Sequence, residues 1–320
     1  MGQGRIAVIE AMRGFAAISV ALFHFSVQLE GPVRALFGYG WLGVDVFFVI
    51  SGFVIPFSLF GRGYSLRQFP QFLLRRMVRL EPPYLASIAL VLAVWSLAAV
   101  AVGLGGDRPE YSWAQVASHL LYAIPLTHYT WISEAYWSLA YEFVFYIVAG
   151  LTFASLIEWS VEWTVLLALA IMGALYPVEH AFDVCIVEFL VGVIVMRIVT
   201  GTGDHRRLWF WLAASVAASL AIAGVWVAGA VTAAAAAILF LRQQEFGGWS
   251  LAIGSMSYSL YLTHTSFGIL VMQAGKGFDI GLPYQILLMM VALTIAVAFA
   301  FVFAQIIERP SMQVSRQIAA

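Results

Sequence analysis

Long apolar segments separated by short polar connections run along the whole chain. Most of them are near the roughly 20 residues that a helix needs to cross a bilayer. About ten can be laid out: Ile6–Gln28, Trp41–Phe60, Tyr84–Leu104, Ala135–Ile157, Glu162–Tyr176, Asp183–Val199, Leu208–Gly224, Val225–Leu241, Leu251–Met272 and Tyr284–Ile307. A bilayer core offers no water to unpaired backbone groups, so these segments should be helices packed as one bundle. The pattern predicts an all-α, polytopic transmembrane helix bundle that forms a single domain over residues 1–320.

The composition agrees with this prediction, because 62% of the 320 residues are hydrophobic and only 10% are charged. Glu10 and Arg13 interrupt the first apolar segment, which we therefore expect to remain as a helix rather than to be cleaved as a signal peptide. Cys185 is the only cysteine, which excludes an internal disulfide and a cysteine-based metal site.

Lysine and arginine concentrate on the cytoplasmic side of membrane proteins. With the N-terminus inside and ten crossings, Arg34, Arg108 and Lys276 fall outside and all other basic residues fall inside. The charge distribution therefore predicts that both termini are cytoplasmic. A net charge of -1 gives no reason to expect nucleic-acid binding.

The first segment carries ionisable residues on one helical face. Arg13 and His24 are eleven residues apart, which brings them to nearly the same face and separates them by roughly 16 Å along the axis. Glu10 falls within about 40° of that face. Ionisable groups inside membrane spans are costly and usually face a bundle interior, so each suggests a functional site. The alternative is that Arg13 reaches back to the interface beside Glu10 and His24 bonds a neighbouring helix.

Four titratable groups from four helices share one layer in the outer half of the predicted bundle. The helical rise places Asp45 about 6 Å, Glu142 roughly 10 Å, His24 about 6 Å and His264 about 12 Å from the outer ends of their spans. Ser138 precedes Glu142 by one turn, and Tyr261 precedes His264 by about one turn. Two structural alternatives stay open, in which Asp45 caps its helix and His264 is a packed core histidine. The outer-loop histidines His119 and His128 are weaker candidates that interface solvent could equally explain.

A cluster of arginines follows the second span. In FLLRRMVRLEPPY, Arg75, Arg76 and Arg79 fall on one side of a short helix that we expect to stop before Pro82 and Pro83. Guanidinium groups bind phosphates through paired hydrogen bonds. The alternative is attraction to anionic lipid headgroups.

Six segments, in order, resemble those of the membrane acyltransferase 3 family, and together they cover nearly the whole chain. They are IEAMRGFAAISVALFHF, WLGVDVFFVISGFVI, FLLRRMVRLEPPY, WSLAYEFVFY, SYSLYLTH and IERP. The resemblance implies an O-acyltransferase of a bacterial inner membrane that moves an acyl group, most simply acetyl, from cytoplasmic acyl-CoA to a hydroxyl of a carbohydrate or secondary metabolite. It implies His24 as the essential histidine and Arg13 as its paired basic residue. Many relatives have a second acidic residue directly after the position of Glu142, where this chain has Phe143.

These predictions combine into one mechanistic hypothesis. Arg75, Arg76 and Arg79 hold the phosphates of acyl-CoA, a co-substrate rather than a permanently bound cofactor. Neutral His24 takes the proton of the acceptor hydroxyl, and Glu142 or Asp45 orients or stabilises His24. Direct attack and an acyl-histidine intermediate both remain open. The supporting residues in this hypothesis are Arg13, Glu10, His264, Tyr261 and Ser138.

A second interpretation belongs to another class of protein. The same buried charges can line the translocation path of a transporter or flippase for a lipid-linked or polar metabolite. It predicts substrate movement without consumption of acyl-CoA.

Overall fold

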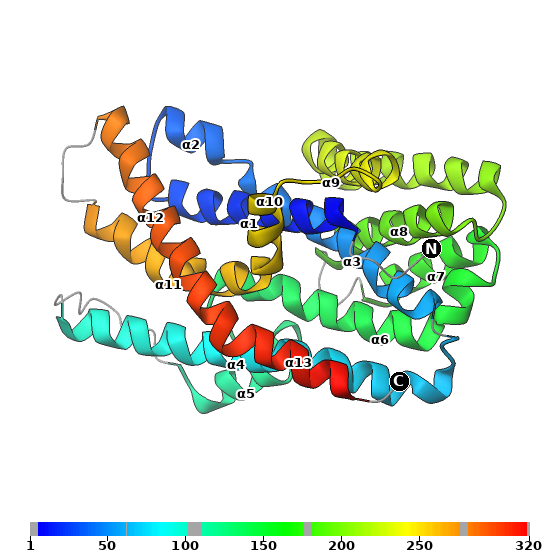
Figure 1. Cartoon of the computed structure of the whole chain (residues 1–320), viewed down its shortest axis with the longest axis horizontal. Coiled ribbons are helices and arrows are strands. Elements are labelled where there is room, and N and C mark those ends of the chain that lie inside the picture. The colour runs from blue at the N-terminus through cyan, green and yellow to red at the C-terminus, as the bar shows by residue number, and fades with distance from the viewer. Residues whose placement is uncertain (1–5, 62, 102–110, 176–180, 276–280, 319–320) are drawn as a thin grey trace. The chain divides into compact units, whose positions relative to one another are not determined.

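A computed structural model describes residues 6–61, 63–101, 111–175, 181–275 and 281–318 (Figure 1). Within these ranges the chain forms helices and no strands, as the apolar pattern predicts. The elements are α1 (Ala7–Ser26), α2 (Pro32–Phe37), η1 (Gly40–Leu42), α3 (Gly43–Phe60), η2 (Leu66–Gln68), α4 (Phe69–Ala101), α5 (Trp113–Leu120), η3 (Ile124–Leu126), η4 (Glu134–Tyr136), α6 (Trp137–Ile157), α7 (Val161–Leu175), α8 (Ala181–Thr200), α9 (His205–Leu241), α10 (Gly248–Ser255), α11 (Ser257–Gly275), α12 (Leu282–Phe303), η5 (Ala304–Glu308) and α13 (Arg309–Gln317).

The chain divides into two compact units. The first is built from residues 1–16, 42–73 and 141–255, and the second from residues 17–41, 74–140 and 256–320. The helices α1, α4 and α6 each contribute residues to both units. A single domain over residues 1–320 stays a prediction.

Six helical stretches of the described chain are long and apolar enough to cross a membrane. They are Ala7–Ser26, Pro32–Phe60, Leu66–Leu97, Glu134–Phe153, His205–Leu241 and Leu282–Gln317. An integral membrane protein is therefore confirmed, while ten crossings and cytoplasmic termini stay predictions. Arg108 and Lys276, on which the charge argument partly rests, lie outside the described residues, as do the predicted span ends Leu104 and Tyr176.

Glycines let the helices of the first unit approach closely. The helix α8 packs against α3, α7 and α9. A Cβ atom on Gly52 of α3 would lie 2.2 Å from the carbonyl oxygen of Phe189, and one on Gly192 of α8 would lie 2.2 Å from that of Val49. Small residues at such crossings allow backbone contact, which replaces the hydrophobic driving force that a bilayer does not supply.

The helix α9 contains a break near its middle. Gly224 has φ +86°, a left-handed conformation that costs glycine little. The sequence analysis divided the seventh and eighth segments at this residue, and the backbone departs from helical geometry there.

The expected stop before Pro82 and Pro83 is wrong. The helix α4 runs without interruption from Phe69 to Ala101 and includes both prolines. Each proline removes one N–H donor and leaves a carbonyl of the preceding turn without its helical partner. In this region the hydroxyl of Tyr258 donates to the carbonyl of Leu80 at 3.0 Å. The carbonyl of Leu80 can still pair with the N–H of Tyr84; the carbonyls that lose a helical partner are those of Val78 and Arg79. Membrane helices tolerate proline, because neighbouring groups can satisfy such carbonyls.

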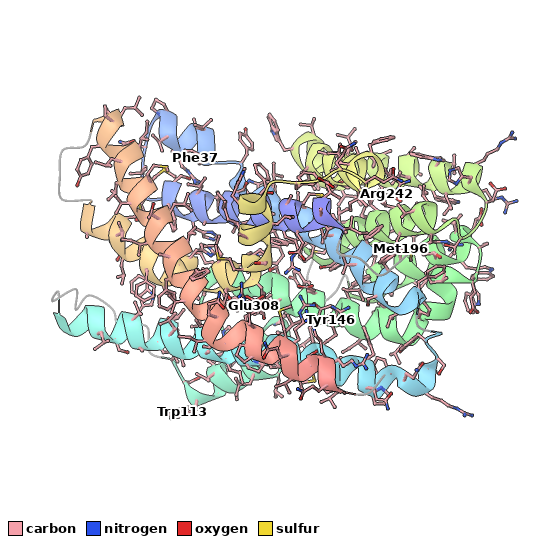
Figure 2. The ribbon with its side chains drawn as sticks, viewed as in Figure 1. Phe37, Trp113, Tyr146, Met196, Arg242 and Glu308 are labelled. Carbon is pink, nitrogen blue, oxygen red and sulfur yellow. The ribbon has the colours of Figure 1, made fainter. Side chains whose placement is uncertain are left out.

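The prediction of one continuous helix over the ninth span, Leu251–Met272, is also wrong, because α10 ends at Ser255 and α11 begins at Ser257. The buried carboxylate of Glu308 accepts hydrogen bonds from the backbone N–H of Ser259, at 3.2 Å, and from its hydroxyl. The N–H groups in the first turn of a helix have no partner within it, and the helix dipole favours a negative charge there. Glu308, in the IERP segment, thus caps α11 from the π-helical turn η5 (Figure 2).

The described part of the connection between α4 and α6 folds around a buried histidine. Trp113 at the start of α5 is 88% exposed, but His119 on the same helix is fully buried. His119 Nε2 accepts from the backbone N–H of Ile132 at 3.0 Å, and its Nδ1 lies 3.2 Å from the hydroxyl of Tyr84. The interpretation of His119 as a solvated residue is therefore wrong, because its ring holds two distant segments of the second unit together.

Candidate active site

Two predicted histidines meet in the second unit. His24, near the end of α1, and His264, in α11, lie with Nδ1 of His24 3.1 Å from Nε2 of His264. Their ring centroids are 4.9 Å apart. His264 is fully buried, and 11% of the His24 side chain is exposed. The sequence predicted that both histidines share a layer, and the structure shows direct contact between them.

Backbone carbonyls determine the protonation of this pair. A carbonyl oxygen can only accept, so the Nδ1–H of His264 donates to the carbonyl of Tyr261 at 2.8 Å. In a neutral ring, Nε2 of His264 then keeps its lone pair and accepts from the Nδ1–H of His24. That same Nδ1–H also faces the carbonyl of Val20 at 2.9 Å. Neutral His24 therefore carries its proton on Nδ1, and its Nε2 keeps the lone pair.

Nε2 of His24 faces a carboxylate. The nearest oxygen of Glu134 lies 4.0 Å away, and the Glu134 side chain is 89% exposed. This distance is too long for a hydrogen bond between the carboxylate and the nitrogen. The lone pair of Nε2 is thus oriented toward the solvated end of the pair, where a substrate hydroxyl can reach it.

Local packing explains why the two histidines meet. Gly268 lies one turn beyond His264 on α11, and a Cβ atom there would lie 2.1 Å from the ring of Phe25. Because Gly268 has no side chain, the ring of Phe25 fits against α11 and brings the neighbouring His24 with it. One turn before His264, the hydroxyl of Tyr261 is hydrogen-bonded to that of Ser138 at 2.6 Å. The second unit thus contains four of the predicted site residues in contiguous contact.

Glu142 lies in the first unit. Its Oε1 accepts hydrogen bonds from the hydroxyl of Ser51 on α3 at 2.9 Å and from that of Tyr146 on α6 at 2.6 Å. Two hydroxyl donors on one oxygen hold this side chain in a defined position. A fixed carboxylate is able to orient a base or accept a hydrogen bond from a substrate hydroxyl.

Asp45 also lies in the first unit, in the first turn of α3, but it does not stand alone. Its carboxyl group interacts with that of Glu188 on α8. Asp45 is 6% exposed and Glu188 is fully buried. Two neighbouring carboxyl groups repel each other when both are ionised, and burial of either charge is costly.

Arg13 and Glu10 belong to the part of α1 in the first unit. Both are half-buried, and no ion pair joins them among the described residues. Here α1 packs tightly against α10, because a Cβ atom on Gly254 would lie 1.9 Å from the carbonyl oxygen of Glu10.

The arginines of α4 are half-buried in the second unit, and Arg75 has a protein partner. Its Nε donates to the carbonyl of Ile318 at 2.9 Å, and the hydroxyl of Ser315 donates to the carbonyl of Arg75 at the same distance. Arg75 therefore ties the C-terminal helix α13 to α4. Arg76 and Arg79 lie on the same side of α4 by helical spacing.

Comparison with known proteins identifies the family. A family profile described as an acyltransferase domain matches residues 6–308. The chain belongs to this acyltransferase family. Membership places it among the enzymes that transfer acyl groups, as the resemblance predicted.

The curated relatives of this acyltransferase include an O-acetyltransferase and a putative membrane-bound transacylase. Over 87 residues it is 37% identical to the O-acetyltransferase OatA of Staphylococcus aureus, a match that covers 26% of this chain and 13% of OatA. Over 161 residues it is 34% identical to the putative membrane-bound transacylase BcsY of Komagataeibacter xylinus, covering 44% of this chain and 35% of BcsY. The matched segments thus span a minor part of these relatives. No solved structure matches the chain.

Two acidic residues of the acyltransferase escaped the sequence analysis. Glu188 lies within the sixth predicted span, and an ionisable residue in a span should itself have suggested a site. Glu134 lies at the edge of a predicted loop, where charged residues are common and no periodicity marks one. Only the fold places its carboxylate beside His24.

Proposed function

We propose that this acyltransferase moves an acyl group, most simply acetyl, from cytoplasmic acyl-CoA to a hydroxyl of a carbohydrate or related metabolite, with His24 as the general base. The observation that supports it best is the orientation of His24, whose protonated Nδ1 faces two acceptors while Nε2 keeps its lone pair near Glu134. A general base needs a neutral nitrogen within reach of the proton that it takes.

In the proposed reaction, the acyl group passes directly from the thioester to the acceptor oxygen. Nε2 of His24 takes the acceptor's hydroxyl proton while the oxygen forms a bond with the carbonyl carbon of the thioester. The carbon–sulfur bond breaks, and the thiolate of CoA leaves and receives the proton from His24. Glu134 stabilises His24 while it is positively charged, because opposite charges at this distance attract. The products are an ester and free CoA.

We assign binding of the acyl-CoA donor to the arginine cluster of α4. Guanidinium groups pair well with phosphate oxygens, and CoA carries several phosphates. Arg75 also supports α13, and Arg76 and Arg79 have partners of their own, so each arginine of the cluster can have a structural role beside donor binding. In the first unit, Glu142 is proposed as a fixed carboxylate that can bind a substrate hydroxyl, with Asp45 as the alternative acid and Arg13 and Glu10 as supporting residues of that unit.

The acceptor is assigned by analogy with the relatives. OatA is named as an O-acetyltransferase, and the chemistry of a histidine base suits an oxygen nucleophile. The proposed location is the inner membrane of a bacterium.

Acetyl-CoA labelled in the acetyl group tests the proposal directly. Purified protein in lipid vesicles is incubated with the donor and candidate carbohydrate acceptors, and both free CoA and labelled acceptor are measured. We expect the two products in equal amounts. Movement of a metabolite across the vesicle membrane with no loss of acetyl-CoA would instead support a transporter or flippase.

A further inference from the structure

We propose that His264 is a positioning residue for this reaction: its Nε2 accepts the Nδ1–H of His24 and so holds the lone pair of His24 Nε2 toward the acceptor hydroxyl. This inference rests on the proposed function, since it concerns how His24 acts as the base. A catalytic base is commonly oriented by a third group, which is a carboxylate in many enzymes. In the second unit a neutral imidazole occupies that place.

The hydrogen-bond direction along the pair follows from atoms whose roles are fixed. The carbonyl of Tyr261 requires a proton on Nδ1 of His264, which leaves Nε2 of His264 as an acceptor. The only hydrogen that Nε2 faces is that on Nδ1 of His24, 3.1 Å away among the described residues. The carbonyl of Val20 accepts from the same N–H. Two acceptors on one N–H favour a single ring orientation and disfavour the other tautomer.

The pair also determines which ring carries the positive charge. When His24 takes a proton on Nε2, its Nδ1–H becomes a stronger donor, and the bond to His264 strengthens. The charge stays on His24, because His264 is fully buried and the carboxylate of Glu134 lies on the side of His24. His264 thus stabilises the positively charged form of His24 while remaining neutral itself.

Three substitutions of His264 separate this role from packing. His264→Phe keeps an aromatic ring and removes the acceptor. His264→Gln can place its amide oxygen near the position of Nε2, whereas His264→Asn reaches only to the position of Nδ1. We expect His264→Phe and His264→Asn to lower kcat on the order of 10- to 100-fold with an unchanged KM for acetyl-CoA, since loss of an orienting group costs mainly catalysis. His264→Gln should recover most of the rate.

The exposed histidine His128 supplies the control, and His128→Gln should keep wild-type kcat and KM. A kcat of His264→Phe equal to that of the wild type would overturn the inference while leaving the proposed function in place. So would equal losses in the Gln and Asn variants, because a packing role does not distinguish where the acceptor lies.

Nitrogen-15 NMR of histidine-labelled wild-type protein in lipid tests the inference even if the variants fail to fold. We expect a protonated Nδ1 and a bare Nε2 on His24, and a coupling between Nδ1 of His24 and Nε2 of His264 across their hydrogen bond. A proton on Nε2 of His24, or no coupling between the rings, would contradict the inference.

Discussion

A histidine acts as a base only through a nitrogen that keeps its lone pair, and at His24 neighbouring acceptors decide which nitrogen that is. The carbonyl of Val20 belongs to the same helix, so any histidine one turn later on α1 could use it. The second acceptor, His264, comes from α11 and is available only in the folded unit. The chemistry of His24 thus combines a local contribution with one from tertiary packing.

His119 gives a prediction about pH at the scale of one residue. Burial lowers the pKa of His119 to about 4, compared with about 6.5 for an exposed histidine. The folded state therefore binds fewer protons than the unfolded state between these values. The stability that His119 contributes is present in full above about pH 6.5, decreases as the pH falls toward 4, and changes no further below that.

Thermal unfolding of the purified protein between pH 7.5 and 4 measures this contribution. His119→Gln can still accept from the N–H of Ile132 through its amide oxygen but does not titrate, so its melting temperature should depend less on pH. Identical slopes for the two proteins would show that His119 is not buried as described.

At this scale, the sequence predicted the candidate site residues more reliably than the residues that they contact. The cost of burying charge identified His24, His264, Glu142 and Asp45 from single positions in apolar segments. The partners Ser51, Glu134 and Glu188 come from other elements, and their contacts depend on helix rotation and packing that helical spacing alone does not define.

At the scale of elements, the apolar pattern predicted where helices lie and some of their ends, but not every continuation and break. The end of α1 and the break in α9 were close to expectation, because apolar length and glycine act locally. The continuous α4 and the separate α10 and α11 were not. Glu308 caps the start of α11 from a distant element, and local helix signals do not reveal such a tertiary partner. Proline is tolerated inside membrane helices, so Pro82 and Pro83 did not mark an end of α4.

Gly268 should control the approach of α1 to α11. Gly268→Ala places a methyl group against the ring of Phe25, where the available distance is 2.1 Å. We expect a loss of stability of about 1–3 kcal/mol from overpacking, and a lower kcat because His24 moves away from His264. Unfolding and label-transfer assays on the same preparation measure both effects.

Gly229 in α9 is the matched control, since a Cβ atom there meets nothing within 4 Å. Gly229→Ala should be neutral or stabilise by about 0.4–1 kcal/mol. If Gly268→Ala behaves like Gly229→Ala, the close packing of Phe25 on α11 is not what positions His24.

At the scale of the whole molecule, membership of the acyltransferase family is established, and six stretches of the described chain are long and apolar enough to cross a membrane. Orientation in the membrane is predicted from charge alone. In a variant whose single native cysteine, Cys185, is replaced by alanine, cysteines at Trp113 and Arg206 test it. A membrane-impermeant maleimide added to intact cells should label position 113 and spare position 206. The reverse labelling would contradict cytoplasmic termini.

The proposed donor site gives a second prediction at this scale. Arg76→Gln combined with Arg79→Gln should raise the KM for acetyl-CoA about tenfold or more and change kcat little, since charge-assisted hydrogen bonds to phosphate are lost. Arg67→Gln, which removes an exposed arginine predicted to lie on the same side of the membrane, is the control. An unchanged KM in the double variant would assign Arg76 and Arg79 to lipid headgroups instead.

The most direct test of the account is label transfer from acetyl-CoA by His24→Ala, measured beside the wild type in protein that unfolds at a similar temperature. Loss of a general base predicts a decrease on the order of 10²- to 10⁴-fold in both labelled acceptor and released CoA. Near-normal transfer by a folded His24→Ala protein would contradict the account, because no other group in the second unit is proposed to take the acceptor's proton.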